Sequence, residues 1–411
     1  MNSSVRIKRT TVLNGQAALL PASKSLSNRA LIINALAGGS SALHNLSDAN
    51  DTQLMFRLVT SPDRVIDVED AGTTMRFLTA FFSITNRRKV LTGTPRMKER
   101  PIGILVDALR SLGARIEYLQ KQGYPPHEIL EFGGQKTSHI RIRGDVSSQY
   151  ISALMMIAPT LPNGLRLELE GKVGSRPYIE MTAALMEHFG VSCKISPGNI
   201  EIPHQAYLPA SYTVESDWSA ASYWFSFSAL AEEAHLALPR LSVTSLQGDS
   251  KIMSIMESLG VKAQHQDGLL HLTKNDFSTR LEWDFTDCPD LAQTVAVICG
   301  AKGIVGKFTG LESLRIKETD RIAALQNELR KIGADLIEED TAHWTLVPAA
   351  SLPASAAFST YEDHRMAMAF APLATLMDVE IENPGVVRKS YPNFWNDLEA
   401  VGFSVTHSIV D

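Results

Sequence analysis

The stretch ELRKIGADLIE, residues 328–338, contains the pattern from which the fold can be worked out. It ends an amphipathic segment in which Leu325, Leu329 and Ile332 recur at helical spacing. Gly333 follows, and glycine is the residue that takes the left-handed conformation at a helix C-terminus most easily. A short apolar stretch comes next. The sequence therefore predicts a helix, a glycine stop and a strand.

The same helix–glycine–strand pattern occurs five times, at intervals of about 70 residues. Six polar or glycine-containing turns, each leading into an apolar helix, interleave with these copies. The alternative is chance recurrence in an ordinary α/β protein. We favour six α+β units of roughly 70 residues, three per domain, with the first unit shortened. The closing glycines are Gly113, Gly190, Gly260, Gly333 and Gly402, and the openings stand at Ser23, Gly72, Ser147, Asp217, Asp290 and Asp363.

The first unit is the irregular one, because only a short interval separates its opening from the next. Residues 57–69, RLVTSPDRVIDVE, occupy the place where a second helix and its strands should be. We therefore expect the first unit to lack that helix.

Composition limits the class of protein. The chain has 411 residues, which favours two domains, and is 44% hydrophobic and 20% charged. A net charge of −6 argues against nucleic acid as a partner. The N-terminus has no apolar leader, and no stretch approaches the ~18 apolar residues of a membrane span. The three cysteines show no CxxC spacing, so we expect a cytoplasmic protein without disulfides.

The helix openings carry the chemistry. A helix N-terminus presents unpaired N–H groups and about half a positive charge, so several of them together attract anions. Each opening alone could be an ordinary cap or tight turn, but polar clusters recur at the same point of nearly every repeat. The segments are LPASKSLSNRALIINAL (20–36), DAGTTMRFLTAFF (70–82), GDVSSQYISALMM (144–156), CPDLAQTVAVI (288–298) and YEDHRMAMAFAPLA (361–374).

Four further segments add charge or hydroxyl groups: LTGTPRMKERPIG (91–103), GSRPYIEMT (174–182), SLRIKETDRIAAL (313–325) and RKSYPNFW (388–395). In the third of these, Lys317 and Glu318 are adjacent just before an amphipathic helix. An exposed ion pair there would contribute little to stability, so a general acid/base pair is the sharper hypothesis. The motifs GxxxxGK[ST], GxGxxG after the first strand and HExxH do not occur. We therefore expect no nucleotide or nicotinamide cofactor and no catalytic metal.

In order along the chain, SKSLSNRA, AGTTMR, LTGTPRMKERPIG, SSQ, PYIEMT, IKETDRIAAL and DHRMAMAF closely resemble the 5-enolpyruvylshikimate-3-phosphate synthase family. The resemblance covers the chain from about residue 13 to the C-terminal helix. It implies a two-domain, enolpyruvyl transferase-like inside-out α/β barrel of six repeats. It also implies a first lobe of residues 1–19 and 215–411, a second lobe of residues 20–214, and an active site in the cleft between them.

The resemblance further implies the reaction. The 5-hydroxyl of shikimate-3-phosphate adds to C2 of phosphoenolpyruvate while C3 takes a proton, and the tetrahedral intermediate then loses phosphate and the C3 proton. We expect a monomer with these two small-molecule substrates and no cofactor. The implied catalytic residues are Asp290, Glu318, Lys24, Lys317 and His364.

The implied binding residues fall into two sets. Those for shikimate-3-phosphate are Lys24, Ser25, Arg29, Ser147, Ser148, Gln149, Ser175, Tyr178, Asp290, Ser313 and Lys317. Those for phosphoenolpyruvate are Lys24, Gly72, Arg96, Gln149, Glu318, Arg321, His364, Arg365 and Lys389.

Departures from the family pattern leave this set of proton-transfer groups complete. Ala22, Asp70, Phe77, Arg176 and Ser313 each replace a usual family residue. Two alternatives remain. The related UDP-N-acetylglucosamine enolpyruvyl transferases usually carry a loop cysteine, where this chain has Thr-Pro-Arg at 94–96. A non-catalytic anion-binding relative would have no use for carboxylates beside anionic ligands.

Overall fold

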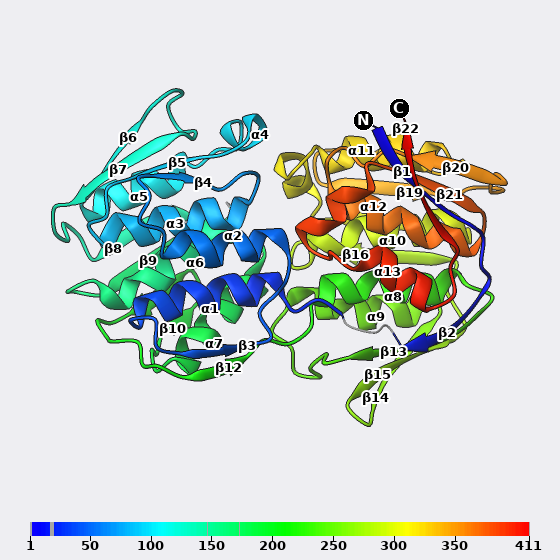
Figure 1. Cartoon of the computed structure of the whole chain (residues 1–411), viewed down its shortest axis with the longest axis horizontal. Coiled ribbons are helices and arrows are strands. Elements are labelled where there is room, and N and C mark those ends of the chain that lie inside the picture. The colour runs from blue at the N-terminus through cyan, green and yellow to red at the C-terminus, as the bar shows by residue number, and fades with distance from the viewer. Residues whose placement is uncertain (1, 17–19, 146, 172, 411) are drawn as a thin grey trace. The chain divides into compact units, whose positions relative to one another are not determined.

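The computed structural model describes residues 2–16, 20–145, 147–171 and 173–410 (Figure 1). The chain divides into two compact units: unit 1 is formed by residues 1–22 and 215–411, and unit 2 by residues 23–214. The boundary that we expected at residue 19 falls on residues 17–19, which lie outside the described part of the chain.

One repeat of unit 1 shows the plan of the others. Two parallel strands are joined by a buried helix, a second helix follows, and an antiparallel hairpin pairs with the second strand. The sheet order is β16-β17-β19-β18. The elements are β16 (Arg280–Asp284), η3 (Pro289–Leu291), α10 (Ala292–Lys302), β17 (Val305–Thr309), η4 (Glu312–Ile316), α11 (Arg321–Arg330), β18 (Asp335–Glu338) and β19 (His343–Val347).

The other two repeats of unit 1 have the same strand order, β2-β13-β15-β14 and β20-β21-β1-β22, and each includes a strand from the N-terminal segment. The elements of the first are β2 (Val12–Gln16), α8 (Trp218–Leu230), β13 (Glu233–Pro239), η2 (Gly248–Lys251), α9 (Ile252–Leu259), β14 (Val261–Gln266) and β15 (Leu269–Lys274). Those of the second are β20 (Ser355–Phe358), α12 (His364–Phe370), η5 (Ala371–Thr375), β21 (Asp378–Glu382), η6 (Pro384–Lys389), α13 (Phe394–Ala400), β22 (Val405–Val410) and β1 (Asn2–Ile7).

Unit 2 contains two full repeats, with sheets β4-β5-β7-β6 and β8-β9-β11-β10. The elements of the first are β4 (Val65–Asp67), α3 (Gly72–Ile84), β5 (Lys89–Thr92), α4 (Pro95–Lys98), α5 (Gly103–Leu112), β6 (Ala114–Tyr118) and β7 (His127–Phe132). Those of the second are β8 (His139–Arg143), α6 (Ser148–Ile157), η1 (Ala158–Thr160), β9 (Leu165–Glu170), α7 (Arg176–His188), β10 (Lys194–Ser196) and β11 (Asn199–Ile202).

The shortened repeat differs from the sequence prediction. Its parallel pair, β12 (Ser211–Thr213) with β3 (Ala42–His44), flanks α1 (Lys24–Leu36). The second helix is present, as α2 (Asn50–Val59), so the prediction that it is missing was wrong. What this repeat lacks is the hairpin, because β4 already belongs to the next sheet. The helix escaped notice because it ends at Thr60 without a glycine.

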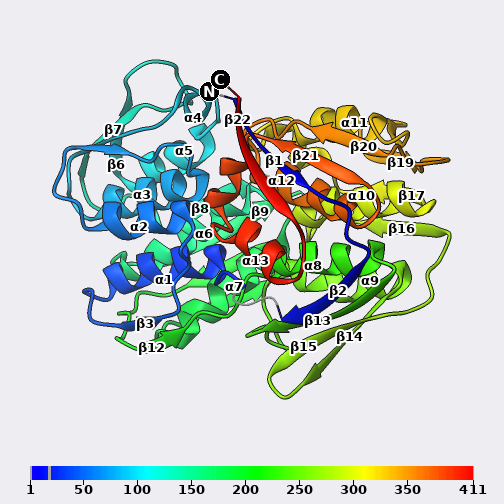
Figure 2. The ribbon, with the colours of Figure 1, turned by 45° about the vertical axis from the view of Figure 1, so that its right-hand side comes forward.

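The first helix of each repeat forms the core of its unit. In unit 1, α8, α10 and α12 pack on one another, and in unit 2 α1, α3 and α6 do so (Figures 1 and 2). Almost every residue of α8 is buried. The predicted closures are confirmed, since all five glycines that end the second helices have φ between 81° and 121°. Helices therefore lie inside and sheets outside in each unit, and the core helices begin at the predicted openings.

Candidate active site

The core helices of unit 1 begin next to one another. Arg365, the second residue of α12, donates through Nη2 to Ser219 at the start of α8, at 3.3 Å. The same nitrogen donates to the Asp290 carboxylate, just before α10, at 2.9 Å. Three helix N-termini therefore meet at one point of unit 1. Their partial positive charges add to those of the basic side chains there.

Arg321, the first residue of α11, connects the acidic residues of this point. Its guanidinium donates to Asp290 at 2.9 Å, to Glu318 at 2.9 Å and to Asp363 at 2.6 Å. The Arg321 side chain is 2% exposed and that of Asp363 is fully buried. Asp363 also caps α12 by accepting from the backbone N–H of Arg365. This guanidinium therefore fixes the positions of three carboxylates that belong to three different segments.

Asp290 occupies the predicted opening, but its side chain does not cap α10. Its two oxygens instead accept from Arg321 and Arg365, and Lys317 Nζ lies 3.9 Å from Oδ1. Burial alone would raise the pKa of Asp290, but Arg365, Lys317 and Arg321 together hold it below its ordinary value. The carboxylate is therefore ionised and held between cations.

Most of the remaining predicted residues of unit 1 lie beside a charged group of this cluster. Glu318 accepts from Arg321, and its other oxygen lies 3.7 Å from Lys389 Nζ. Burial lowers the pKa of Lys317, with Asp290 opposing the shift. His364 is buried at the start of α12, with Nδ1 3.7 Å from Asp363 Oδ1. Ser313 is exposed on η4.

The core helices of unit 2 also begin close together. Gln149 at the start of α6 donates to the Thr73 hydroxyl at the start of α3, at 3.0 Å. Gly72 precedes Thr73, and a Cβ atom there would come within 2.9 Å of the guanidinium groups of both Arg76 and Arg100. Glycine therefore lets two basic side chains approach the α3 N-terminus closely.

Lys24 is held by a carboxylate that the sequence did not point to. Its Nζ lies 3.1 Å from Asp51 on α2, and the Asp51 side chain is 4% exposed. The backbone carbonyl of Asp51 accepts from Thr74 on α3. The helix that we expected to be missing thus links Lys24 to the start of α3.

Arg29 is buried under the surface of unit 2 rather than presented at it. Its guanidinium donates to Thr182 at 2.7 Å, to Ser152 at 3.0 Å and to the carbonyl of Ser25 at 3.0 Å. Burial lowers its pKa to about 10. Three of its five N–H groups are therefore used inside unit 2.

The other predicted residues of unit 2 lie at helix starts or on a short helix. Ser147 caps α6, Ser148 is its first residue, and Ser175 stands directly before α7 with φ +53°. Arg96, on the short α4, pairs with Glu99 at 3.0 Å, and both side chains are largely exposed. Tyr178 lies on α7, with its ring 5.8 Å from the Arg29 guanidinium carbon.

Neither a metal site nor a membrane span emerges from the described residues. Within them, no group of three or more His, Cys, Asp or Glu side chains is arranged to hold a metal ion. No helix in that part of the chain is both long and apolar enough to cross a membrane.

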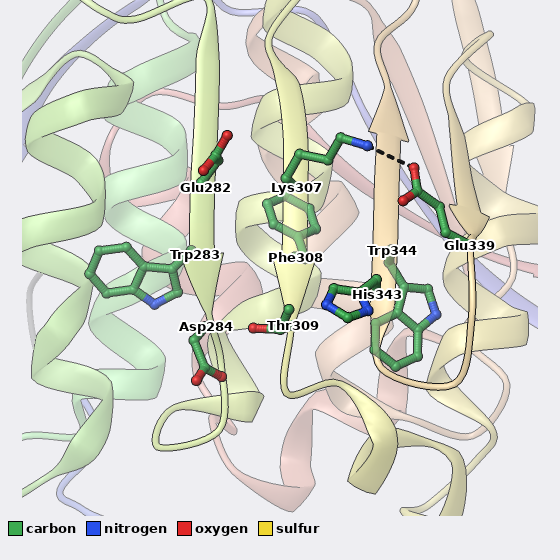
Figure 3. A pocket seen from close by; sticks show the side chains of 9 residues that line it. All are labelled: Glu282, Trp283, Asp284, Lys307, Phe308, Thr309, Glu339, His343 and Trp344. Atoms are coloured by element: carbon green, nitrogen blue, oxygen red, sulfur yellow. Dashed lines mark hydrogen bonds and ion pairs between the residues drawn. The ribbon is translucent and has the colours of Figure 1, made fainter.

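A cavity of about 410 Å³ lies elsewhere on unit 1, along β16, β17 and β19 (Figure 3). Lys307 pairs there with Glu339 at 2.7 Å. Its lining contains none of the residues discussed above, and we assign no ligand to it.

The repeats and the paired carboxylates among basic side chains define an enzyme of the enolpyruvyl transferase type. A family model described as EPSP synthase (3-phosphoshikimate 1-carboxyvinyltransferase) matches residues 7–61 and 57–398. The chain belongs to the EPSP synthase family.

Individual relatives agree with this assignment. The chain is 49% identical over 392 residues to a 3-phosphoshikimate 1-carboxyvinyltransferase of Bacteroides fragilis strain YCH46, covering 94% of this chain and 95% of the relative. It is 36% identical over 435 residues to a 3-phosphoshikimate 1-carboxyvinyltransferase of Sulfurovum sp. strain NBC37-1, and the match covers 97% of this chain and 99% of that relative. The solved EPSP synthase of Acinetobacter baumannii matches with a TM-score of 0.78 at 18% identity over all of both chains, which bears on the fold. The expected fold, a two-domain inside-out α/β barrel of six repeats, is confirmed.

Proposed function

We propose that this chain transfers the enolpyruvyl group of phosphoenolpyruvate to the 5-hydroxyl of shikimate-3-phosphate and releases phosphate. The family assignment supports this reaction, which belongs to aromatic amino acid biosynthesis. The observation that carries the chemistry is the pair Asp290 and Glu318, two carboxylates that Arg321 holds among basic side chains. A protein that only bound anions would gain nothing from carboxylates at that place.

We assign Asp290 as the acceptor of the 5-hydroxyl proton. In the free protein its oxygens are occupied by Arg321 and Arg365, and its low pKa makes it a weak base. Substrate anions that draw Arg365 and Lys317 toward themselves remove part of this stabilisation and so raise the basicity of Asp290. Binding of the anionic substrates thus prepares the base for its step.

We assign the protons at C3 to Glu318, with Lys24 or Lys317. Addition places a proton on C3 and forms the bond from the 5-oxygen to C2. Elimination removes a C3 proton and breaks the bond from C2 to the phosphate oxygen. Each positioned proton-transfer group typically contributes about 10²–10⁴-fold. His364, beside Asp363, is proposed as a member of the phosphoenolpyruvate-binding set.

The basic side chains divide between the two substrates. We propose that Gly72, Arg96, Arg321, Arg365 and Lys389 bind phosphoenolpyruvate, that Ser147, Ser148 and Ser175 bind the shikimate phosphate, and that Lys24 and Gln149 contact both. Ser25, Arg29, Tyr178 and Ser313 complete the shikimate-3-phosphate set. Charge-assisted bonds to phosphate and carboxylate oxygens are the strong ones, which suits these residue types.

We further propose that the protein acts as a monomer in the cytoplasm. All three cysteines, Cys193, Cys288 and Cys299, are free thiols, which suits a reducing compartment.

The test is phosphate release from phosphoenolpyruvate, with and without shikimate-3-phosphate, by the wild type and Glu318→Ala. We expect release that needs both substrates and falls at least about 100-fold in the variant. Glu312→Ala, at an exposed position of η4, is the matched control and keeps the wild-type rate. Tight binding of shikimate-3-phosphate without any phosphate release would overturn the proposed reaction.

A further inference from the structure

Asp249 is a buried carboxyl group with no role in the reaction as derived so far. It lies on η2, and the residue is 2% exposed. Its Oδ2 accepts a short hydrogen bond from the Ser219 hydroxyl. Its Oδ1 is buried and has no hydrogen-bond partner among the described residues. Burying a carboxylate with an unpaired oxygen costs folding free energy.

A chain of hydrogen bonds connects Asp249 with the proposed base. The Ser219 hydroxyl donates to Asp249 and accepts from Arg365 Nη2 at 3.3 Å. The same Nη2 donates to Asp290 Oδ2 at 2.9 Å. Both hydrogens of this nitrogen are therefore engaged, one on the path to Asp249 and one on Asp290.

The charges around Asp249 are unbalanced. The carboxylates of Asp290, before α10, and Asp217, at the start of α8, act on it, as does the cation Arg365. The thiol of Cys288 also lies near it and is neutral, because burial and the Asp249 charge both raise the pKa of that thiol. Burial, followed by the charge of Asp290, raises the pKa of Asp249 to about 7, although Arg365 and the Ser219 hydroxyl oppose the shift. Asp249 therefore changes charge near neutral pH.

We propose that Asp249 is a positioning residue that, through Ser219, controls how strongly Arg365 binds phosphoenolpyruvate. This inference rests on the proposed function, in which Arg365 receives that substrate. When Asp249 is neutral, the positive charge of Arg365 is attracted by Asp290 and by the bound substrate but not by Asp249. Ionised Asp249 adds a third negative charge in a water-poor place and weakens anion binding at Arg365.

Asp249→Asn tests this role, because asparagine keeps the size and the bond from Ser219 but cannot ionise. KM for phosphoenolpyruvate and kcat are measured for both proteins from pH 5.5 to 8.5. The ratio of the two KM values cancels the ionisation of the substrate and of every group whose pKa is the same in both proteins. We expect the wild-type KM to equal that of the variant at low pH and to exceed it about tenfold at pH 8.5. We expect kcat to stay within about twofold.

Asp267→Asn is the matched control, since Asp267 is exposed at the tip of the β14–β15 hairpin with φ +53°. Its KM ratio to the wild type should not change with pH. A flat ratio for Asp249→Asn as well, or a change confined to kcat, overturns the inference.

A second measurement separates this inference from the proposed function. If the wild type releases no phosphate with both substrates, the proposed function fails. The Kd of phosphoenolpyruvate, measured by calorimetry at pH 6 and pH 8.5 for the wild type and Asp249→Asn, then decides the role of Asp249. The same pH-dependent difference in Kd supports it, and no difference overturns it.

Discussion

At Arg321 a single buried guanidinium satisfies carboxylates from three segments of unit 1. Arginine suits this position because its donors form a rigid planar fork, whereas lysine offers one compact charge. Arg321→Lys therefore leaves at least one buried carboxylate unpaired. Since loss of one partner of a buried ion pair costs about 3–5 kcal/mol, we expect a loss approaching that range in urea unfolding.

Arg315→Lys is the control for this variant. Arg315 also pairs with two carboxylates, Asp320 at 3.3 Å and Glu338 at 2.5 Å, but all three side chains are at least 36% exposed. Exposed pairs contribute about 0–1 kcal/mol. Equal losses in the two variants would contradict the role given to Arg321.

Asp249 also links stability to pH. Above the ordinary pKa of a carboxyl group, the unfolded state has released the proton of Asp249. The folded state still binds this proton, because the pKa of Asp249 is raised there. Stability from this group is therefore greatest in acid and falls as the pH rises toward 7. Asp249→Asn removes this pH dependence. Between the ordinary carboxyl pKa and pH 7, the free energy of unfolding of the variant therefore rises relative to that of the wild type by at most about 1.4 kcal/mol per pH unit. Urea unfolding at pH 5, 6, 7 and 8 measures the gain, and a gain independent of pH would contradict it.

Sequence reasoning located the residue types of the site better than their partners. Asp290, Glu318, Arg321 and Arg365 were implied by the family resemblance, in segments that also stand out as polar clusters near helix starts, and the structure brings all four together. The pairing of Asp290 with Arg365 joins positions 75 apart, which no local pattern specifies. The same holds for Asp249, which stands in a turn without periodicity and gave no signal.

At the scale of elements, the glycine closures set where the second helices stop. Gly333 has φ +83°, and a Cβ there would meet its nearest atoms at 3.7 Å, so an alanine fits but is strained. We expect Gly333→Ala to lower the free energy of unfolding by about 1–2 kcal/mol. Gly385→Ala is the control, since Gly385 has no positive φ and open space around its Cα. A loss of the same size in both variants would show that the backbone conformation is not the cause.

The same glycines explain both the success and the error of the repeat prediction. Five helices ending in a glycine gave the period, and their positive φ values are a local property that a sequence can reveal. The helix α2 ends with Thr60 in a right-handed conformation, so nothing marked its end. Its place is fixed by tertiary contacts, among them Asp51 with Lys24 and with Thr74, and local sequence does not encode them.

At the scale of the whole molecule, unit 1 depends on both ends of the chain. The N-terminal segment supplies β2 to one sheet and β1 to another, where β1 lies between β21 and β22. β1 runs antiparallel to β22, with Asn2 opposite Val410. A two-residue linker from Val410 to Asn2 would therefore have the length of a tight hairpin loop.

A circular permutant tests this view of the fold. Val410 is joined to Asn2 by an Asn-Gly linker, because Asn-Gly favours the tight turn. New ends are opened between Asp267 and Gly268, the exposed two-residue tip of the β14–β15 hairpin. We expect cooperative unfolding, a stability within about 1 kcal/mol of the wild type and phosphate release with both substrates.

A second permutant with the same joined ends is opened between Val297 and Ile298, inside the buried core helix α10. Breaking this helix leaves backbone N–H and C=O groups unpaired in the core, so we expect no cooperative unfolding and no activity. If the hairpin permutant also fails to fold, then folding depends on the order of the segments along the chain and not only on the contacts between them. If both permutants fold, the core helices contribute less than their burial implies. The expected contrast shows that the contacts of the repeats, and not the positions of the chain ends, hold the fold that carries the site.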